Sequence, residues 1–193
     1  MARNPERRTA LVDAAIDVLA HEGARGLTFR AVDTRAGVPL GTSSNYFTSR
    51  DDLFMQAGSR INHRMTPDAA EVAHAMRPEP SRELVAALMR WLVQRMIDDR
   101  TGYLAMLELR LEATRRPALR IRLTETVRAE FDRNHSLYLD AELPGDTTTF
   151  LALHLAMTGL LLEHLTLPDM LSDTTLDRLV DLVVTCVVPA RHA

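Results

Sequence analysis

The chain is most informative between Thr28 and Arg50, where it reads TFRAVDTRAGVPLGTSSNYFTSR. This stretch predicts two short helices around a tight glycine turn: Thr28 is suited to cap the first helix, Gly37 ends it, and Pro39 is suited to begin the second. The second helix, expected over residues 39–45, is rich in hydroxyl side chains that have no use in an apolar core. A polar helix of this kind is suited to lie against DNA.

Apolar residues recur at helical spacing on both sides of this segment. A first helix is expected over residues 5–21, and Gly23 and Gly26 end its pattern. A fourth helix is expected to start at Arg50 and to end near Pro67. Later helices are expected at residues 69–76, 84–96, 103–115, 118–139, 147–165 and 175–188.

No alternating strand pattern or internal repeat is present, so the sequence predicts an all-α fold with about nine helices. Residues 1–49 are expected to form a three-helix, helix-turn-helix DNA-binding domain. Residues 50–193 are expected to form a larger helical domain.

Composition favours a cytoplasmic protein. The single Cys186 cannot form an internal disulfide, and no apolar run typical of a signal peptide lies near the N-terminus. The most apolar stretch, residues 150–162, is interrupted by polar residues and is shorter than the roughly 18–20 residues that cross a membrane. We therefore expect no membrane partner.

Charge is unevenly distributed along the chain. The net charge is −3, but residues 1–50 hold seven arginines and five acidic residues, which leaves −5 for residues 51–193. Any contact with a polyanion is therefore expected at the N-terminus.

The N-terminal residues resemble the DNA-binding domain of TetR-type transcriptional regulators. The similarity covers residues 7–54 with the family's spacing kept throughout, and is therefore far more specific than an isolated helix-turn-helix. The matching positions are Leu11 to Ala15, Gly23, Thr28 to Val32, Ala36 to Val38, Gly41, Thr42, Tyr46, Phe47 and Arg50 to Leu53.

The resemblance implies a set of DNA contacts. Thr28, Tyr46 and Arg50 would contact the phosphate backbone, with Arg50 standing where the family more often has lysine. Hydroxyl groups, helix N-termini and arginine are all good partners for phosphate. The full set is Thr28, Arg30, Pro39, Leu40, Gly41, Thr42, Ser43, Ser44, Asn45, Tyr46 and Arg50.

Within this set, Thr42, Ser43 and Asn45 are expected to reach base edges, since asparagine can pair with both polar groups of adenine. The chain departs from the family at Ser44, where an aromatic residue is usual, and at Asn45, where the family often has histidine or tyrosine. For Arg30, a place on the solvated helix surface is at least as probable as a DNA contact.

The second domain offers candidates for an effector cavity. Aromatic and methionine side chains at helical spacing could line a cavity or form ordinary core. The candidates are Trp91, Met96, Tyr103, Met106, Phe131, Tyr138 and Met157. Glu108 and Glu112, four residues apart, could attract a cationic ligand, although a solvated face explains them equally well.

The resemblance implies a ligand-responsive regulator of transcription, and it favours a repressor. Residues 50–193 would then be the domain for effector binding and dimerisation. The regulator would bind a palindromic DNA operator as a homodimer through the apolar segments 147–165 and 175–188, and a small apolar or cationic effector would release it. The alternative is an all-helical small-molecule binding protein that has lost DNA binding.

Of the functions considered, an enzyme is the one that the sequence supports least. The sequence has no nucleophile, metal or phosphate-binding constellation at workable spacing. His135, His154, Glu163 and His164 form no close ligand pair, so no metal or cofactor is expected.

Overall fold

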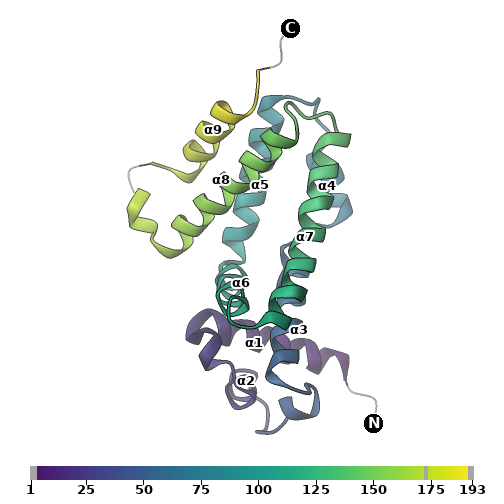
Figure 1. Cartoon of the computed structure of the whole chain (residues 1–193), viewed down its shortest axis with the longest axis vertical. Helices are drawn as coiled ribbons and strands as arrows, with labels where there is room; N and C mark the ends of the chain where they lie inside the picture. Colours follow the sequence, from purple (N-terminus) through teal and green to yellow (C-terminus); the bar gives the residue numbers. More distant parts are fainter. Residues whose placement is uncertain (1–3, 172–173, 191–193) are drawn as a thin grey trace. The chain divides into compact units, whose positions relative to one another are not determined.

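The computed structural model describes residues 4–171 and 174–190, and within them the chain is helical with no β-strand. The expectation of an all-α fold is confirmed (Figure 1). The elements are α1 (Pro5–Gly26), α2 (Phe29–Arg35), η1, a 3-10 helix (Ser43–Asn45), α3 (Arg50–Met65), α4 (Ala69–Ala75), α5 (Arg82–Asp98), α6 (Arg100–Ala113), α7 (Pro117–Asp140), α8 (Thr147–Thr166), η2, a second 3-10 helix (Pro168–Leu171), and α9 (Leu176–Val187).

Helix α1 begins and ends through local backbone chemistry. Asn4 caps it, because its side-chain oxygen accepts hydrogen bonds from the amides of Glu6 at 2.9 Å and Arg7 at 3.3 Å. Gly23 adopts φ +70°, which kinks the helix and lets a further turn follow as far as Gly26. The expected end at residue 21 is therefore too early by one kinked turn.

The helices pack as two compact units, Met1–Thr66 with Asp99–Arg128 and Pro67–Asp98 with Ala129–Ala193. We call them unit 1 and unit 2. These units are defined by packing, so the functional boundary expected after residue 49 stays a prediction. Helix α7 contributes its first half to unit 1 and its second half to unit 2.

The core of unit 1 lies among α1, α2, α3 and α6. Leu11, Ile16, Leu53, Phe54 and Leu109 are fully buried there, and α1 contacts each of the other three helices. Burying side chains of this size stabilises the unit by about 1.5–3 kcal/mol each. Since α2 packs on α1, the segment that follows α2 is carried on a rigid base.

The core of unit 2 lies among α5, α8 and α9, which contact one another in pairs. Leu153, Met157 and Leu161 of α8 are buried in this core. Helix α8 is the only helix in the described ranges that is long and apolar enough to cross a membrane by length and composition. Helix α8 is longer than the apolar stretch at residues 150–162. The core helix of a protein that does not cross a membrane can have the same length and composition.

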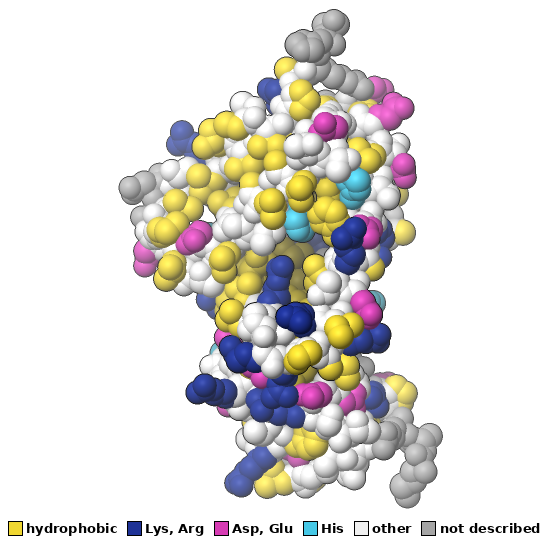
Figure 2. Space-filling view, in the orientation of Figure 1, with side chains coloured by type: hydrophobic (Ala, Val, Ile, Leu, Met, Phe, Trp, Pro, Cys, Tyr) yellow, Lys and Arg dark blue, Asp and Glu magenta, His cyan; other side chains and the backbone are white. Residues whose placement is uncertain are grey.

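The outer side of α8 and α9 is unusually apolar. Leu151, Leu155 and Leu162 of α8 and Leu182 of α9 are exposed, with Leu155 at 62% and Leu182 at 59%. Figure 2 shows hydrophobic side chains gathered over these two helices. Gly159 lies on the same side, and a Cβ atom added there would meet nothing within 4 Å. Exposed apolar side chains that gather on two packed helices are typical of an interaction surface.

Candidate nucleic-acid interface and pocket

The segment after α2 is a compact turn and not the α-helix expected over residues 39–45. Only Ser43–Asn45 is helical, as η1, and its amide bonds span three residues, with Tyr46 N–H donating to the Ser43 oxygen at 2.9 Å. Gly41 adopts φ +90°, a left-handed conformation that a right-handed helix cannot contain. The predicted helix type is therefore wrong here.

Asp33 holds this turn from inside unit 1. It is fully buried, and its carboxylate accepts from the Gly41 amide at 2.6 Å, the Ser43 amide at 2.7 Å and the Ser43 hydroxyl at 2.5 Å. Bonds to a charged acceptor are about twice as strong as neutral ones, so they fix the turn. The sequence analysis missed Asp33. A signal was present, because Asp33 lies next to Val32 and four residues after Phe29, within the apolar side of its helix, and an acidic residue there needs a buried partner.

Ser43 is removed from the predicted base-reading set. Its side chain is fully buried and its hydroxyl donates to Asp33, so it presents no surface to a ligand. Its role in this structure is to anchor the turn.

The neighbours of Ser43 do point outward. Asn45 is exposed and its amide nitrogen donates to the Gly41 oxygen at 3.2 Å, while the exposed Ser44 hydroxyl donates to the same oxygen at 2.7 Å. Thr42 is half-buried and donates to the Pro39 oxygen at 2.5 Å. These polar side chains bond only to their own turn, so the turn displays a preformed polar face.

Leu40 is the most exposed large apolar side chain of this turn, at 63%. Pro39 and Gly41 beside it are also exposed. The exposed part of the turn is therefore not purely polar, because it also presents an apolar side chain.

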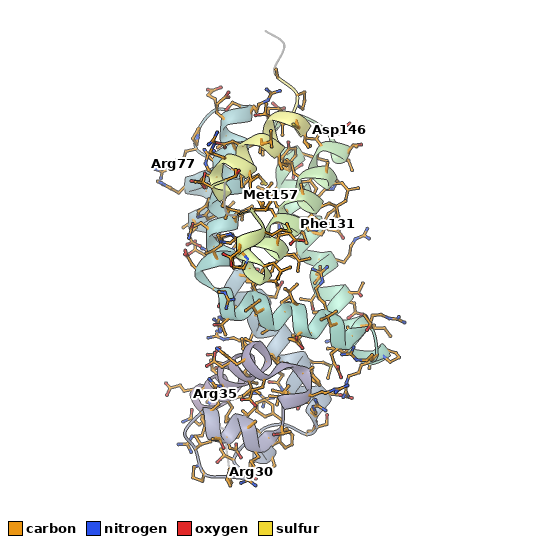
Figure 3. All side chains as sticks on the ribbon, turned by 90° about the vertical axis from the view of Figure 1, so that its left-hand side faces the viewer. Arg30, Arg35, Arg77, Phe131, Asp146 and Met157 are labelled. Atoms are coloured by element: carbon orange, nitrogen blue, oxygen red, sulfur yellow. The ribbon has the colours of Figure 1, made fainter. Side chains whose placement is uncertain are left out.

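The start of α2 adds further polar groups to the same unit. Thr28 is exposed and caps the helix, its hydroxyl accepting from the Ala31 amide at 3.1 Å. The exposed Arg30 extends outward from α2 (Figure 3). Tyr46 is half-buried against the core, whereas Phe47 is only 2% exposed, which confirms that Phe47 is the more buried of the two.

Arg50 opens α3 and is half-buried. Its guanidinium donates to the Ala24 oxygen at the end of α1 and lies 5.2 Å from the centre of the Phe54 ring. A guanidinium over an aromatic face is attracted by the ring electrons. Arg50 is therefore held in one place by two contacts, and its buried Nε has no hydrogen-bond partner.

A second arginine, Arg116, supports the same helix start. Its guanidinium lies 5.2 Å from the Phe54 ring centre and donates to Asp51 at 2.6 Å and to Glu112 at 2.5 Å. The hydrogen bonds from Arg116 and then Arg115 lower the pKa of Glu112. The sequence analysis had no signal for the link from Arg116 to Asp51 and Phe54, because these residues lie far apart in the chain.

Unit 2 contains an apolar pocket. Two of the predicted ligand residues, Trp91 and Tyr138, lie in its wall. Tyr138 is buried, its hydroxyl donates to the Pro144 oxygen at 2.5 Å, and burial raises its pKa to about 12. The wall is completed by Pro67, Val72, Met76, Val85, Leu88, Met89, Leu92, Asn134, Leu137, Leu143 and Phe150.

The other five predicted ligand residues do not line this pocket. Tyr103 and Met106 belong to unit 1, where Met106 packs against the core. Met157 is a buried residue of α8, and the Phe131 ring packs edge-on against the Phe150 ring with 5.3 Å between the ring centres. Both side chains therefore contribute to packing. Met96 is half-buried on α5. Figure 3 labels Phe131 and Met157 on α7 and α8.

The two glutamates considered for a cationic ligand are used elsewhere. Glu108 accepts from the Ala24 amide at 3.1 Å, and Glu112 pairs with the two arginines named above. Both lie in unit 1 and neither lines the pocket. In the described ranges, no group of three His, Cys, Asp or Glu side chains could hold a metal ion.

Two models of known protein families match this chain and determine the family to which it belongs. A family model described as "Bacterial regulatory proteins, tetR family" matches residues 11–57, and one described as "Tetracyclin repressor-like, C-terminal domain" matches residues 80–189. The chain belongs to the TetR family. It is therefore related to transcriptional regulators over both halves, as the resemblance at the N-terminus implied.

Full-length relatives extend this assignment. The HTH-type nicotine-responsive transcriptional repressor HdnoR of Paenarthrobacter nicotinovorans is 26% identical over 90% of this chain and 95% of that protein. A TetR-family structure from Streptomyces coelicolor A3 is 34% identical, with a TM-score of 0.70 over 96% of this chain and all of that one. The multidrug binding protein EbrR complexed with ethidium is 33% identical, with a TM-score of 0.64 over 96% and 100%.

Proposed function

We propose that this TetR-family regulator is a ligand-responsive repressor that binds a palindromic operator as a homodimer. The observation that carries the proposal is the preformed polar face of the turn at residues 39–45, anchored by the buried Asp33. A rigid polar face costs little entropy on binding, which favours recognition of a fixed shape such as the major groove.

The proposed DNA contacts divide by chemistry. Asn45 and Leu40 face base edges, and Thr42 assists them, whereas Ser43 only holds the turn. Phosphate contacts are assigned to groups around this face: the Thr28 hydroxyl and N-terminal end of α2, Arg30, Ser44, Tyr46 and Arg50. Arginine has five N–H donors, and in Arg50 one nitrogen is occupied by Ala24, so donors remain for a phosphate.

The dimer is proposed through α8 and α9. Leu151, Leu155 and Leu162 follow one another at spacings of four and seven residues, so they share one side of α8. Pairing this side with α8 and α9 of a second copy would remove the exposed leucines from water in a four-helix arrangement. Two recognition turns related by a two-fold axis would then read half-sites about 34–36 Å apart.

The effector is proposed to bind in the pocket of unit 2. HdnoR is named as nicotine-responsive and EbrR as a multidrug binding protein, which supports a small-molecule ligand for this chain, and the apolar pocket of unit 2 is a cavity suited to hold one. An effector that prefers one of two states lowers operator affinity by as much as it discriminates between them. The sequence analysis allowed either an apolar or a cationic effector.

We expect Arg50→Ala to weaken binding about equally on all DNA sequences. Removal of one phosphate contact should reduce the slope of log K against log salt by about 0.9. Fluorescence anisotropy on one duplex at several salt concentrations measures the slope. Arg120→Ala, an exposed arginine on the part of α7 that belongs to unit 1, is the matched control. An unchanged slope for Arg50→Ala would remove Arg50 from the phosphate contacts.

We expect Asn45→Ala to act differently, by relaxing preference at individual base pairs. Loss of a good side-chain contact to a base costs about 1–3 kcal/mol of discrimination. Selection of bound duplexes from a random pool with wild-type and Asn45→Ala protein would compare the preferred bases position by position. Equal loss on selected and random duplexes would contradict base reading by Asn45.

The alternative function is a small-molecule binding protein that no longer binds DNA. The selection from a random pool separates the repressor from this alternative, because a protein that no longer binds DNA would enrich no duplex. An enriched sequence with two-fold symmetry supports the repressor dimer.

A further inference from the structure

The wall of the unit 2 pocket carries no charged side chain. Its thirteen residues are aliphatic, thioether or aromatic, apart from the amide of Asn134. The Tyr138 hydroxyl already donates a hydrogen bond to the Pro144 oxygen, and the side-chain N–H of Asn134 donates to the Glu130 carboxylate at 3.4 Å. The side-chain polar groups left in the wall are therefore one donor, the indole N–H of Trp91, and two acceptors, the side-chain oxygen of Asn134 and the hydroxyl oxygen of Tyr138.

One cation already lies over an aromatic ring of the wall. The Arg95 guanidinium lies 5.7 Å from the centre of the Trp91 ring, and it is held there by an ion pair with Glu71 at 3.0 Å. Aromatic faces attract cations through their ring electrons, and here one cation already occupies that attraction. The face of the Trp91 ring that Arg95 covers is therefore not open to a second cation.

The acidic groups around the pocket are already used or lie outside it. Glu71 pairs with Arg95, Glu130 pairs with Arg133, and Asp146 caps α8 by accepting from the Thr149 amide at 2.9 Å. Asp140 lies in an outer groove that shares Met76, Leu137 and Leu143 with the pocket wall. An organic cation would thus find its countercharge in the outer groove and not in the pocket.

We propose that this pocket takes an uncharged, mainly apolar molecule with at most one or two polar groups, and that it discriminates against organic cations. Transfer of a cation into an apolar wall without a countercharge is unfavourable, whereas transfer of a neutral aromatic molecule is favourable. This deepens the proposed function by naming the chemical class of the effector, and it rests on that proposal only for the assignment of unit 2 as the effector half.

The chain contains a single tryptophan, so Trp91 emission reports on this pocket alone. The full-length protein is titrated with N-phenyl-1-naphthylamine, which is neutral, and with ethidium, which is a permanent cation. The expected result is quenching of Trp91 by the neutral probe with a Kd at least tenfold lower than that of ethidium. An ethidium Kd equal to or lower than that of the neutral probe overturns the proposal, as does failure of both probes to quench Trp91.

A matched pair of variants tests the cause. Met89→Glu places a carboxylate in the wall, and Met89→Gln places an uncharged side chain of the same length there. Met89→Glu should bind ethidium at least tenfold more tightly than Met89→Gln, while the neutral probe should show no such gain. Equal ethidium affinities in the two variants contradict the missing countercharge as the cause.

This test uses no DNA, so its outcome is separate from that of the proposed function. If the selection from random duplexes fails while the probes behave as expected, the repressor is disproved and the ligand class stands. If a duplex is selected and ethidium binds best, the ligand class is disproved and the repressor stands.

Discussion

Replacing Asp33 with alanine is expected to reduce operator affinity at least a hundredfold and to lower the free energy of unfolding by about 3 kcal/mol or more. The side chain is fully buried, and its removal leaves the amides of Gly41 and Ser43 and the Ser43 hydroxyl without their partner. Each orphaned buried polar group costs about 1–3 kcal/mol. Chemical denaturation measures the stability, and gel shift on a selected duplex measures the affinity.

The loss of affinity has a separate cause from the loss of stability. Without Asp33 the segment from Leu40 to Asn45 is free to sample other conformations, and DNA must then order it at about 1–2 kcal/mol for each backbone residue. A hundredfold loss corresponds to about 2.8 kcal/mol, which the ordering of two or three residues supplies.

Two further variants separate this explanation from a general loss of folding. Asp33→Asn keeps the size and one acceptor oxygen, so it should fall between wild type and Asp33→Ala in both measurements. Thr34→Ala changes the exposed neighbour on α2 and should stay within about 0.5 kcal/mol of wild type. If folded Asp33→Ala kept operator affinity within threefold, the turn would not depend on this carboxylate.

Local patterns in the sequence were sufficient to predict an all-helical chain, α2 and the glycine turn that ends it, but not the form of residues 39–45. Thr28 at a cap and Gly37 after the helix depend on neighbours a few residues away, and propensity arguments treat such neighbours well. The backbone conformation of Gly41 could not be predicted in this way. A helical sequence pattern can continue through a glycine, and its positive φ is seen only in the folded chain.

Side-chain partners across the fold could not be predicted in the same way. Ser43 and Asn45 are two residues apart and chemically alike, yet one is buried on Asp33 and the other is exposed. Arg116 reaches Asp51 across 65 positions of sequence. Periodicity tells which face of a helix is apolar, but it does not tell which residue lies opposite.

The pocket shows the same limit. Trp91 and Tyr138 come from α5 and α7, and their place in one wall follows from the packing of unit 2. Met157 has an equally suitable side chain, but its position on α8 buries it in the core. Pocket and core residues share one composition, so sequence alone predicts candidates and only tertiary structure separates them.

Replacing Leu155 with arginine is expected to convert the proposed dimer into a monomer at micromolar concentration. Leu155 is 62% exposed in the single chain and lies between Leu151 and Leu162 on the apolar side of α8. In a two-fold dimer each copy would bury one unpaired guanidinium, at several kcal/mol for each ion. A total of about 4 kcal/mol or more weakens the dimer Kd at least a thousandfold. Analytical ultracentrifugation measures the dissociation.

The consequence for DNA binding follows from symmetry. A monomer reaches one half-site only, so Leu155→Arg should lose affinity for a two-fold symmetric duplex while keeping its weak affinity for a half-site. Ile121→Arg is the matched control, because Ile121 is 58% exposed but lies in the half of α7 that belongs to unit 1. A wild-type monomer at micromolar concentration, or a Leu155→Arg dimer with unchanged operator affinity, would place the functional interface elsewhere than on α8 and α9.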